Sequence, residues 1–201
     1  MVLIRKQGIL RKQGLLRLDN LSDSKTFSTC LSSSSQELTQ RIQEHASIHL
    51  VEQLDTRTLD TLELLGEVFE PDQRYSRAEY STLETYHNCA LIIAEISHNP
   101  AGLILNNYNP KFEQDTWYIY ELAVLEKYQG RGIAKMLLTI TEHLAQLLGY
   151  SKIGLHCVEE NKQGRKLPEY YHALGFHRTG ERTSEGVCMI KELNKVDLKI
   201  R

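Results

Sequence analysis

The most regular pattern of apolar positions lies near the middle of the chain. Residues Trp117 to Val124 form a continuous apolar and aromatic run, which is typical of a buried strand. After a short polar stretch, apolar residues recur at spacings of three and four, as on one face of a helix. These residues are Ile133, Met136, Leu137, Ile140, Leu144, Leu147 and Leu148. The pattern predicts a strand, a turn and a helix that ends at Gly149-Tyr150.

Apolar runs, helical spacings and turn residues predict further elements on both sides of this unit. Asp55 and Ser76 are suited to cap the first turns of two helices, and residues 98–100 supply turn chemistry between two strands. The further elements are strands at 48–51, 89–96, 101–106, 151–158, 176–181 and 186–193, and helices at 55–69, 76–85 and 167–174. The order predicts one α/β (α+β) domain, with a mixed sheet and helices on both faces.

Residues 1–45 differ in composition from the rest of the chain. The first 18 residues carry five Arg and Lys residues and no acid, and Ser32 to Ser35 form a run of four serines. Such a basic, Ser-rich start is typical of a flexible extension, while an organelle transit peptide and a start site placed too early are the alternatives. We expect a flexible extension over residues 1–45 and a folded domain over residues 46–201.

Length and charge exclude several classes of protein. The chain has 201 residues, enough for one domain with a sizeable core. Its net charge of −2 argues against a general nucleic-acid binder. Since no apolar run approaches the roughly 20 residues that a membrane-spanning helix needs, we expect no membrane segment.

The four cysteines, Cys30, Cys89, Cys157 and Cys188, are scattered without a Cys-x-x-Cys pair. This spacing is not that of a metal site, and three of the four lie in apolar runs. The pattern favours buried free thiols in a reducing cytoplasm, with no metal.

The turn of the central unit has the composition of a phosphate site. Its sequence is Gln129-Gly130-Arg131-Gly132-Ile133-Ala134. The first backbone N–H groups of a helix have no internal partner, and two glycines let a diphosphate approach them. Arg131 adds a cation. The turn is neither the nucleotide P-loop, which closes with Gly-Lys-Ser/Thr, nor the dinucleotide fingerprint Gly-x-Gly-x-x-Gly.

Two motifs together resemble those of the GNAT acetyltransferases. The first is Gln-x-x-Gly-x-Ala at 129–134, after a strand that ends in Leu-Ala-Val, and it is similar to the acetyl-CoA pyrophosphate loop of that family. The second is Asn161 followed by Tyr-x-x-x-Gly-Phe at 171–176, although Asn161 lies two residues farther from Tyr171 than is usual. The order of elements over residues 46–193 also matches.

The resemblance implies a cofactor site for acetyl-CoA. In GNAT proteins the strand before the loop splays from its parallel neighbour, and its backbone binds the pantetheine arm and the thioester carbonyl. The cofactor-binding residues that it implies here are Leu122, Ala123, Val124, Gln129, Gly130, Arg131, Gly132, Ile133, Ala134 and Asn161. Tyr171 takes the place of the phenol that protonates the departing thiolate.

A base is needed as well, because an amine of the lysine type is mostly protonated at neutral pH. Glu121 lies within an otherwise apolar strand, where an unpaired charge is costly, so it faces either a cleft or solvent. His156, on the next strand, titrates in the right range. Tyr118 and Tyr120 alternate to the other face from Glu121, unless a bulge shifts the register. We expect Glu121, or else His156, to be the base.

The resemblance implies an N-acetyltransferase that acts by direct attack of an amine on acetyl-CoA. The acceptor is an amine of a small molecule or a protein. The sequence leaves the possibility of a homodimer undecided. The alternative is a non-catalytic acyl-CoA-binding module with a sensing role, which would have the loop but no working base.

Overall fold

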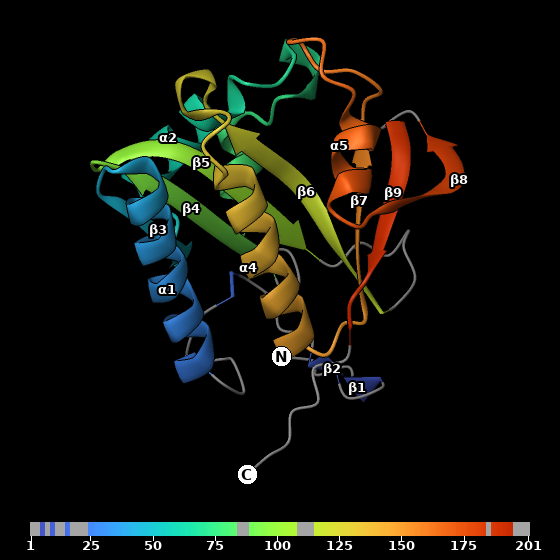
Figure 1. Cartoon of the computed structure of the whole chain (residues 1–201), viewed down its shortest axis with the longest axis horizontal. Helices are drawn as coiled ribbons and strands as arrows, with labels where there is room; N and C mark the ends of the chain where they lie inside the picture. The colour runs from blue at the N-terminus through green and yellow to red at the C-terminus, as the bar shows by residue number, and fades with distance from the viewer. Residues whose placement is uncertain are drawn as a thin grey trace.

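The structure is a computed structural model that describes residues 5–6, 9–10, 15–16, 24–83, 89–107, 115–183 and 186–194. Within these ranges the chain forms one large sheet with helices on both faces (Figure 1). No helix in the described ranges is both long and apolar enough to cross a bilayer. The predicted loop at 107–115 falls mostly on residues outside these ranges, as does the predicted end of the helix at 84–85.

The sheet has seven strands in the order β3-β4-β5-β6-β7-β9-β8. Only β6 and β7 pair in parallel; every other neighbouring pair is antiparallel. A separate small sheet pairs β1 (Arg5–Lys6) with β2 (Ile9–Leu10). The strands of the large sheet are β3 (Ala46–Val51), β4 (Ala90–Ile96), β5 (Asn99–Asn107), β6 (Thr116–Val124), β7 (Lys152–Cys157), β8 (His177–Thr183) and β9 (Gly186–Glu192). The predicted mixed sheet is confirmed.

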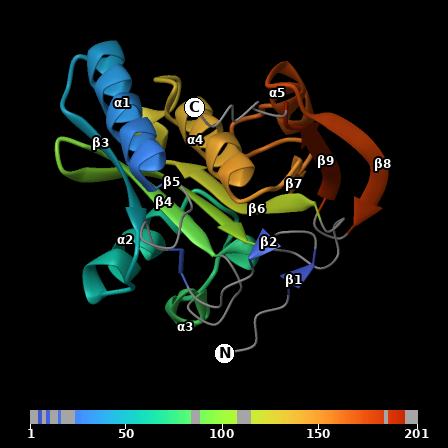
Figure 2. The ribbon, with the colours of Figure 1, turned by 90° about the horizontal axis from the view of Figure 1, so that it is seen from below.

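Helices cover both faces, so the sheet is buried between two apolar cores. Figure 2 shows α1, α4 and α5 on one side of the sheet and α2 and α3 on the other. Short 3-10 turns lie at Pro71–Gln73 and Glu126–Tyr128. The helices are α1 (Ser24–Ile42), α2 (Thr56–Gly66), α3 (Arg77–Ser81), α4 (Ile133–Leu147) and α5 (Leu167–Ala173).

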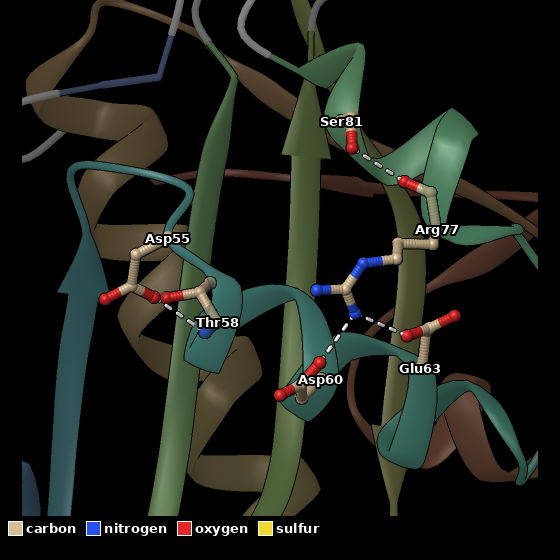
Figure 3. Close-up of polar contacts among 6 residues, drawn as sticks. All are labelled: Asp55, Thr58, Asp60, Glu63, Arg77 and Ser81. Atoms are coloured by element: carbon tan, nitrogen blue, oxygen red, sulfur yellow. Dashed lines mark hydrogen bonds and ion pairs between the residues drawn. The ribbon is translucent and has the colours of Figure 1, made fainter.

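The two predicted N-caps are confirmed. The Asp55 carboxylate accepts from the backbone N–H of Thr58 at 2.7 Å, and Ser76 forms a reciprocal capping box with Glu79. Arg77, the first residue of α3, donates to Asp60 and Glu63 of α2 at 2.6 and 2.7 Å (Figure 3). These contacts hold α3 against α2, beside the β5–β6 part of the sheet.

The turn between β4 and β5 lies earlier than predicted. Ser97 and His98 both have positive φ, 49° and 64°, and Asn99 already belongs to β5. Two successive residues with positive φ form the two-residue hairpin turn whose twist matches the strands. The Asn99 side chain donates to the Ser97 carbonyl at 2.9 Å, which stabilises the turn.

The prediction of a flexible extension over residues 1–45 is wrong for residues 24–42, which form α1. Phe27 and Leu38 are fully buried, and Leu31 and Ser34 lie on the same face. Their spacing of four, three and four is helical, and burial of this face outweighs the weak helix propensity of the serines. The folded unit therefore begins at least 22 residues before Ala46. Most of residues 1–23 lie outside the described residues.

Candidate functional site

The parallel strands β6 and β7 separate part of the way along. Their pairing runs from Thr116 opposite Lys152 to Ile119 opposite Leu155 and stops there, while β6 continues to Val124 (Figure 1). The splayed sheet that the sequence predicted is thus present. Beyond Ile119, the β7 side of β6 has no partner strand among the described residues, so the backbone of Leu122 to Val124 borders the gap.

A β-bulge in β6 changes which side chains share a face. Leu105 pairs with Glu121, and Asn106 pairs with Ile119. Tyr120 is therefore an extra residue on β6 that has no pairing partner on β5. The exception foreseen in the sequence applies: Tyr118, Tyr120 and Glu121 all lie on the face that α2 and α3 cover. The contacts agree, since Tyr120 lines the same pocket as Tyr80, whose hydroxyl contacts Glu121. The Tyr118 and Tyr120 rings meet edge to face at 4.6 Å between centroids.

Glu121 lies in the core of this face and is only 4% exposed. The hydroxyl of Tyr80, on α3, lies 3.1 and 3.2 Å from its two carboxylate oxygens. Burial raises the pKa of Glu121 to about 7, and the hydrogen bond from Tyr80 opposes this rise. Glu121 is therefore shielded from solvent and has no ion-pair partner among the described residues, and burial brings its pKa close to neutral pH.

His156, the second candidate base, is reached through Tyr118. The Tyr118 hydroxyl lies 2.8 Å from Nδ1 of His156, which follows the last β7 residue paired with β6, Leu155. This contact places the half-buried imidazole on the Glu121 face. Each candidate base thus has a tyrosine hydroxyl as its neighbour, from α3 for Glu121 and from β6 for His156.

A small pocket opens beside Glu121, between α3, the end of β5 and the middle of β6. Leu105, at the β5 end, forms part of its apolar wall. The buried side-chain oxygen of Asn107 has no hydrogen-bond partner among the described residues. The polar and aromatic residues that line this pocket, called the Tyr80 pocket below, include Tyr75, Glu79, Tyr80, Asn107 and Tyr120.

The loop before α4 has the geometry of an anion site. Gly130 and Gly132 have φ of 76° and 87°, a conformation that favours glycine. Gly132 is the N-cap of α4, and no side chain caps the helix and no acid lies in its first turn. The Gln129 side chain donates to the carbonyl of Val124 at 3.1 Å, which joins the loop to the end of β6. Ile133 and Ala134 begin the helix itself.

Sequence reasoning missed one cation at this loop. Arg131 pairs with Glu44 at 2.8 Å, and Arg41, from the end of α1, lies directly over Gly132. A Cβ added to Gly132 would lie 2.7 Å from Nη1 of Arg41. The helical spacing of Phe27, Leu31 and Leu38 was the signal that could have revealed the helix that carries Arg41.

Tyr171 and Asn161 lie on the other side of the gap. Tyr171, on α5, is 8% exposed and its ring packs edge to face on Phe176. Burial raises the pKa of its hydroxyl far above the ordinary value, so the phenol stays protonated. The side-chain oxygen of Asn161 accepts from the backbone N–H groups of Gln163 and Arg165 at 3.1 and 2.9 Å. These two hydrogen bonds engage the Asn161 side-chain oxygen within the loop that follows β7.

No group of three or more His, Cys, Asp or Glu side chains suited to hold a metal occurs within the described ranges. The four cysteines are free thiols, three of them buried.

Comparisons with known proteins agree with this architecture. The model of the acetyltransferase (GNAT) family matches residues 48–176. The chain is 30% identical over 97 residues to the uncharacterized N-acetyltransferase YycN of Bacillus subtilis (strain 168), a match that covers 48% of this chain and 60% of that protein. It is 31% identical over 98 residues to the spermine/spermidine N(1)-acetyltransferase of the same organism, covering 46% of this chain and 62% of that protein. The chain thus spans about three fifths of the length of these relatives.

Solved structures share the fold at lower identity. An aminoglycoside 6'-N-acetyltransferase complexed with coenzyme A superposes with a TM-score of 0.62 at 16% identity, covering 73% of this chain and 97% of that one. The PaiA N-acetyltransferase of Thermoplasma acidophilum, in complex with coenzyme A, gives 0.54 at 18%, covering 73% and 99%. Helix α1 lies outside the residues that the family model matches.

Proposed function

Since the chain belongs to the acetyltransferase (GNAT) family, we propose that it transfers an acetyl group from acetyl-CoA to an amine by direct attack. The observation that carries the proposal is the position of Glu121. It is a buried carboxyl group with a pKa of about 7, on the strand whose pairing with β7 ends two residues earlier. A carboxyl group held this way suits proton transfer at neutral pH.

The residues around the gap fit acetyl-CoA as the cosubstrate. The uncapped start of α4 and the two glycines offer backbone N–H groups to a diphosphate, and Arg131 adds a cation. The gap between β6 and β7 offers the backbone of Leu122, Ala123 and Val124 to an extended arm. Bound there, acetyl-CoA supplies an activated thioester. An N–H group aimed at its carbonyl would stabilise the charge that grows on oxygen.

Glu121 receives the proton of the acceptor. An alkylammonium with a pKa of about 10.4 is neutral in only about one molecule in 2,500 at pH 7, which costs about 4.6 kcal/mol. A positioned base contributes a factor of roughly 10²–10⁴ to the rate. The Tyr80 hydroxyl favours the ionised form of Glu121, which is the form that accepts the proton. His156 is the second candidate for this role.

Tyr171 acts on the other side as the hydrogen-bond donor to the leaving thiolate. Its hydroxyl stays protonated because burial raises its pKa. We assign Asn161 a contact with the pantetheine arm through its side-chain NH₂ group, since its oxygen is engaged within its own loop.

The acceptor enters by the Tyr80 pocket. Tyr75, Tyr80 and Tyr120 present aromatic surface there, while Glu79 and the neighbouring Glu121 are acidic, a combination that suits an organic cation. The free thiols fit a cytoplasmic location. Light scattering of the purified chain would measure its molar mass and so test whether it forms a homodimer.

Calorimetric titration with acetyl-CoA, free CoA and ATP tests the cofactor. We expect saturable binding of the first two and none of ATP. An amine library screened for released thiol then tests transfer. Binding without release of thiol from any amine would favour the non-catalytic acyl-CoA-binding module, although the burial of Glu121 weighs against it. Absence of acetyl-CoA binding would refute both functions.

A further inference from the structure

The end of α1 lies against the loop that we assign to the cofactor diphosphate. The Arg41 guanidinium lies over Gly132, and a surface pocket between α1 and α4 is lined by Arg41, Ile42 and residues 130–132. Figure 1 shows α1 and α4 side by side on the same face of the sheet. An element outside the residues that the family model matches thus brings a cation to the start of α4.

Helix α1 is fixed in place by polar contacts with the edge strand β3. The Thr39 hydroxyl accepts from the N–H of Ala46 at 2.9 Å, and the Ser35 hydroxyl accepts from the N–H of Ile48 at 2.9 Å. Together with the buried face of the helix, these contacts fix both its register and its rotation. Because Arg41 lies two residues after Thr39, these contacts fix the backbone from which its side chain reaches the loop.

The charges around the loop are arranged for exchange with an anion. Arg41 pairs with Glu37 at 2.8 Å, and Arg131 pairs with Glu44 at 2.8 Å; all four side chains are partly exposed. Exposed pairs of this kind contribute little to stability. A diphosphate offers each guanidinium a stronger, bidentate partner, and the uncapped helix start adds backbone donors.

We propose that Arg41 binds the diphosphate of CoA, so that the N-terminal helix α1 completes the cofactor site. This inference rests on the proposed function. It adds to that function a binding residue from a segment whose composition had suggested a flexible extension.

The test compares the Kd for CoA of the full chain with those of two matched variants. Arg41→Gln and Glu37→Gln both remove the same surface ion pair, but only the first removes the cation. Loss of a charge-assisted contact predicts a Kd about 10- to 100-fold higher for Arg41→Gln. We expect Glu37→Gln to bind CoA at least as tightly as the wild type. Lys25→Gln removes a charge from the first turn of α1, roughly 24 Å along the helix from Arg41, and should leave Kd unchanged.

Two further ligands locate the contact. Dephospho-CoA, which lacks the 3'-phosphate, should show the same loss on Arg41→Gln as CoA. Pantetheine, which lacks the diphosphate together with the adenosine and its 3'-phosphate, should show none. A loss seen with CoA alone would overturn the assignment to the diphosphate. Equal losses in Arg41→Gln and Glu37→Gln would mean that the ion pair only supports the helix, which also overturns the proposal.

The outcome also separates this inference from the proposed function. A wild-type chain that binds CoA, together with an Arg41→Gln variant that binds it equally well, refutes the role of Arg41 alone. A wild-type chain that binds no CoA refutes the function and this inference together. Thermal unfolding of each variant checks that the fold is retained, and Arg41→Lys, which keeps the charge without the planar fork, should lie between the wild type and Arg41→Gln.

Discussion

The hydroxyl of Tyr80 lies within hydrogen-bond distance of both carboxylate oxygens of Glu121, at 3.1 and 3.2 Å. The two residues are 41 positions apart, one on a five-residue helix and one on the central strand. The contact depends on the bulge at Tyr120, which turns Glu121 towards α3. The proposed base is therefore positioned by a side chain from α3, on the face of the sheet that α2 and α3 cover.

Replacing Glu121 by glutamine should lower kcat by roughly 10²–10⁴, because a positioned base is lost, while Kd for CoA stays unchanged. Titration calorimetry and a thiol-release assay measure the two quantities. A variant with normal turnover would remove Glu121 from the mechanism and leave His156 as the candidate to be tested by the same assay.

The same variant should be more stable than the wild type at alkaline pH. The folded pKa of Glu121, about 7, lies above its ordinary value of 4.5, so the folded state holds the proton more tightly. The stability gained from this tighter proton binding is fully present below about pH 4.5 and is lost as pH rises through 7. Glu121→Gln should therefore gain up to about 3 kcal/mol at pH 8 and little at pH 4.5, as measured by urea unfolding. An equal difference at both pH values would contradict the burial of a titrating carboxyl group.

Tyr80→Phe should move the acid limb of the pH–rate profile to higher pH. The Tyr80 hydroxyl lowers the pKa of Glu121, so its removal lets burial raise that pKa further. The profile of kcat/KM between pH 5 and 9 measures the shift. A variant that lost activity without any shift would show that Tyr80 only shapes the pocket.

Alanine at Gly132 should weaken CoA binding more than alanine at Gly130. Both glycines have positive φ, so each variant loses about 1 kcal/mol of stability through backbone strain. Only at Gly132 does the new Cβ meet Arg41, whereas nothing lies within 4 Å at Gly130. Kd values for CoA and thermal unfolding of the pair test this difference, and equal Kd values would argue against close packing at Gly132.

Tyr171→Phe should lower turnover much more than affinity for CoA, because the proposed role of the hydroxyl is confined to the departure of the thiolate. Its ring contacts with Tyr170 and Phe176 are kept, so the fold should be unchanged. Steady-state kinetics with a saturating acceptor give the comparison. A variant with the wild-type rate would show that Tyr171 is a core aromatic residue and no more.

Local signals in the sequence predicted most of the fold. Caps at Asp55 and Ser76 and the apolar face of α4 depend on neighbours in the chain, and each lies where predicted. Helix α1 was not predicted because its serines have weak helix propensity. Its stability comes from the packing of Phe27 and Leu38 on residues that are distant in the sequence.

The details of the site depended on contacts that no local pattern records. The bulge at Tyr120 is a property of how β5 and β6 pair, so alternation along β6 alone placed Tyr118 and Tyr120 opposite Glu121. The position of Arg41 over Gly132 follows from the docking of α1 on β3. Both features arise between segments far apart in the sequence.

The contacts of α1 with β3 also bear on how copies of the chain meet in concentrated solution. β3 is one edge of the large sheet, and hydroxyls of Ser35 and Thr39 occupy N–H groups that a strand from another molecule would need. At the opposite edge, the pairing of β8 with β9 is irregular between Arg178 and Arg182. The hydroxyl contacts at one border and the irregularity at the other make both edges less suited to pairing with a strand of another molecule.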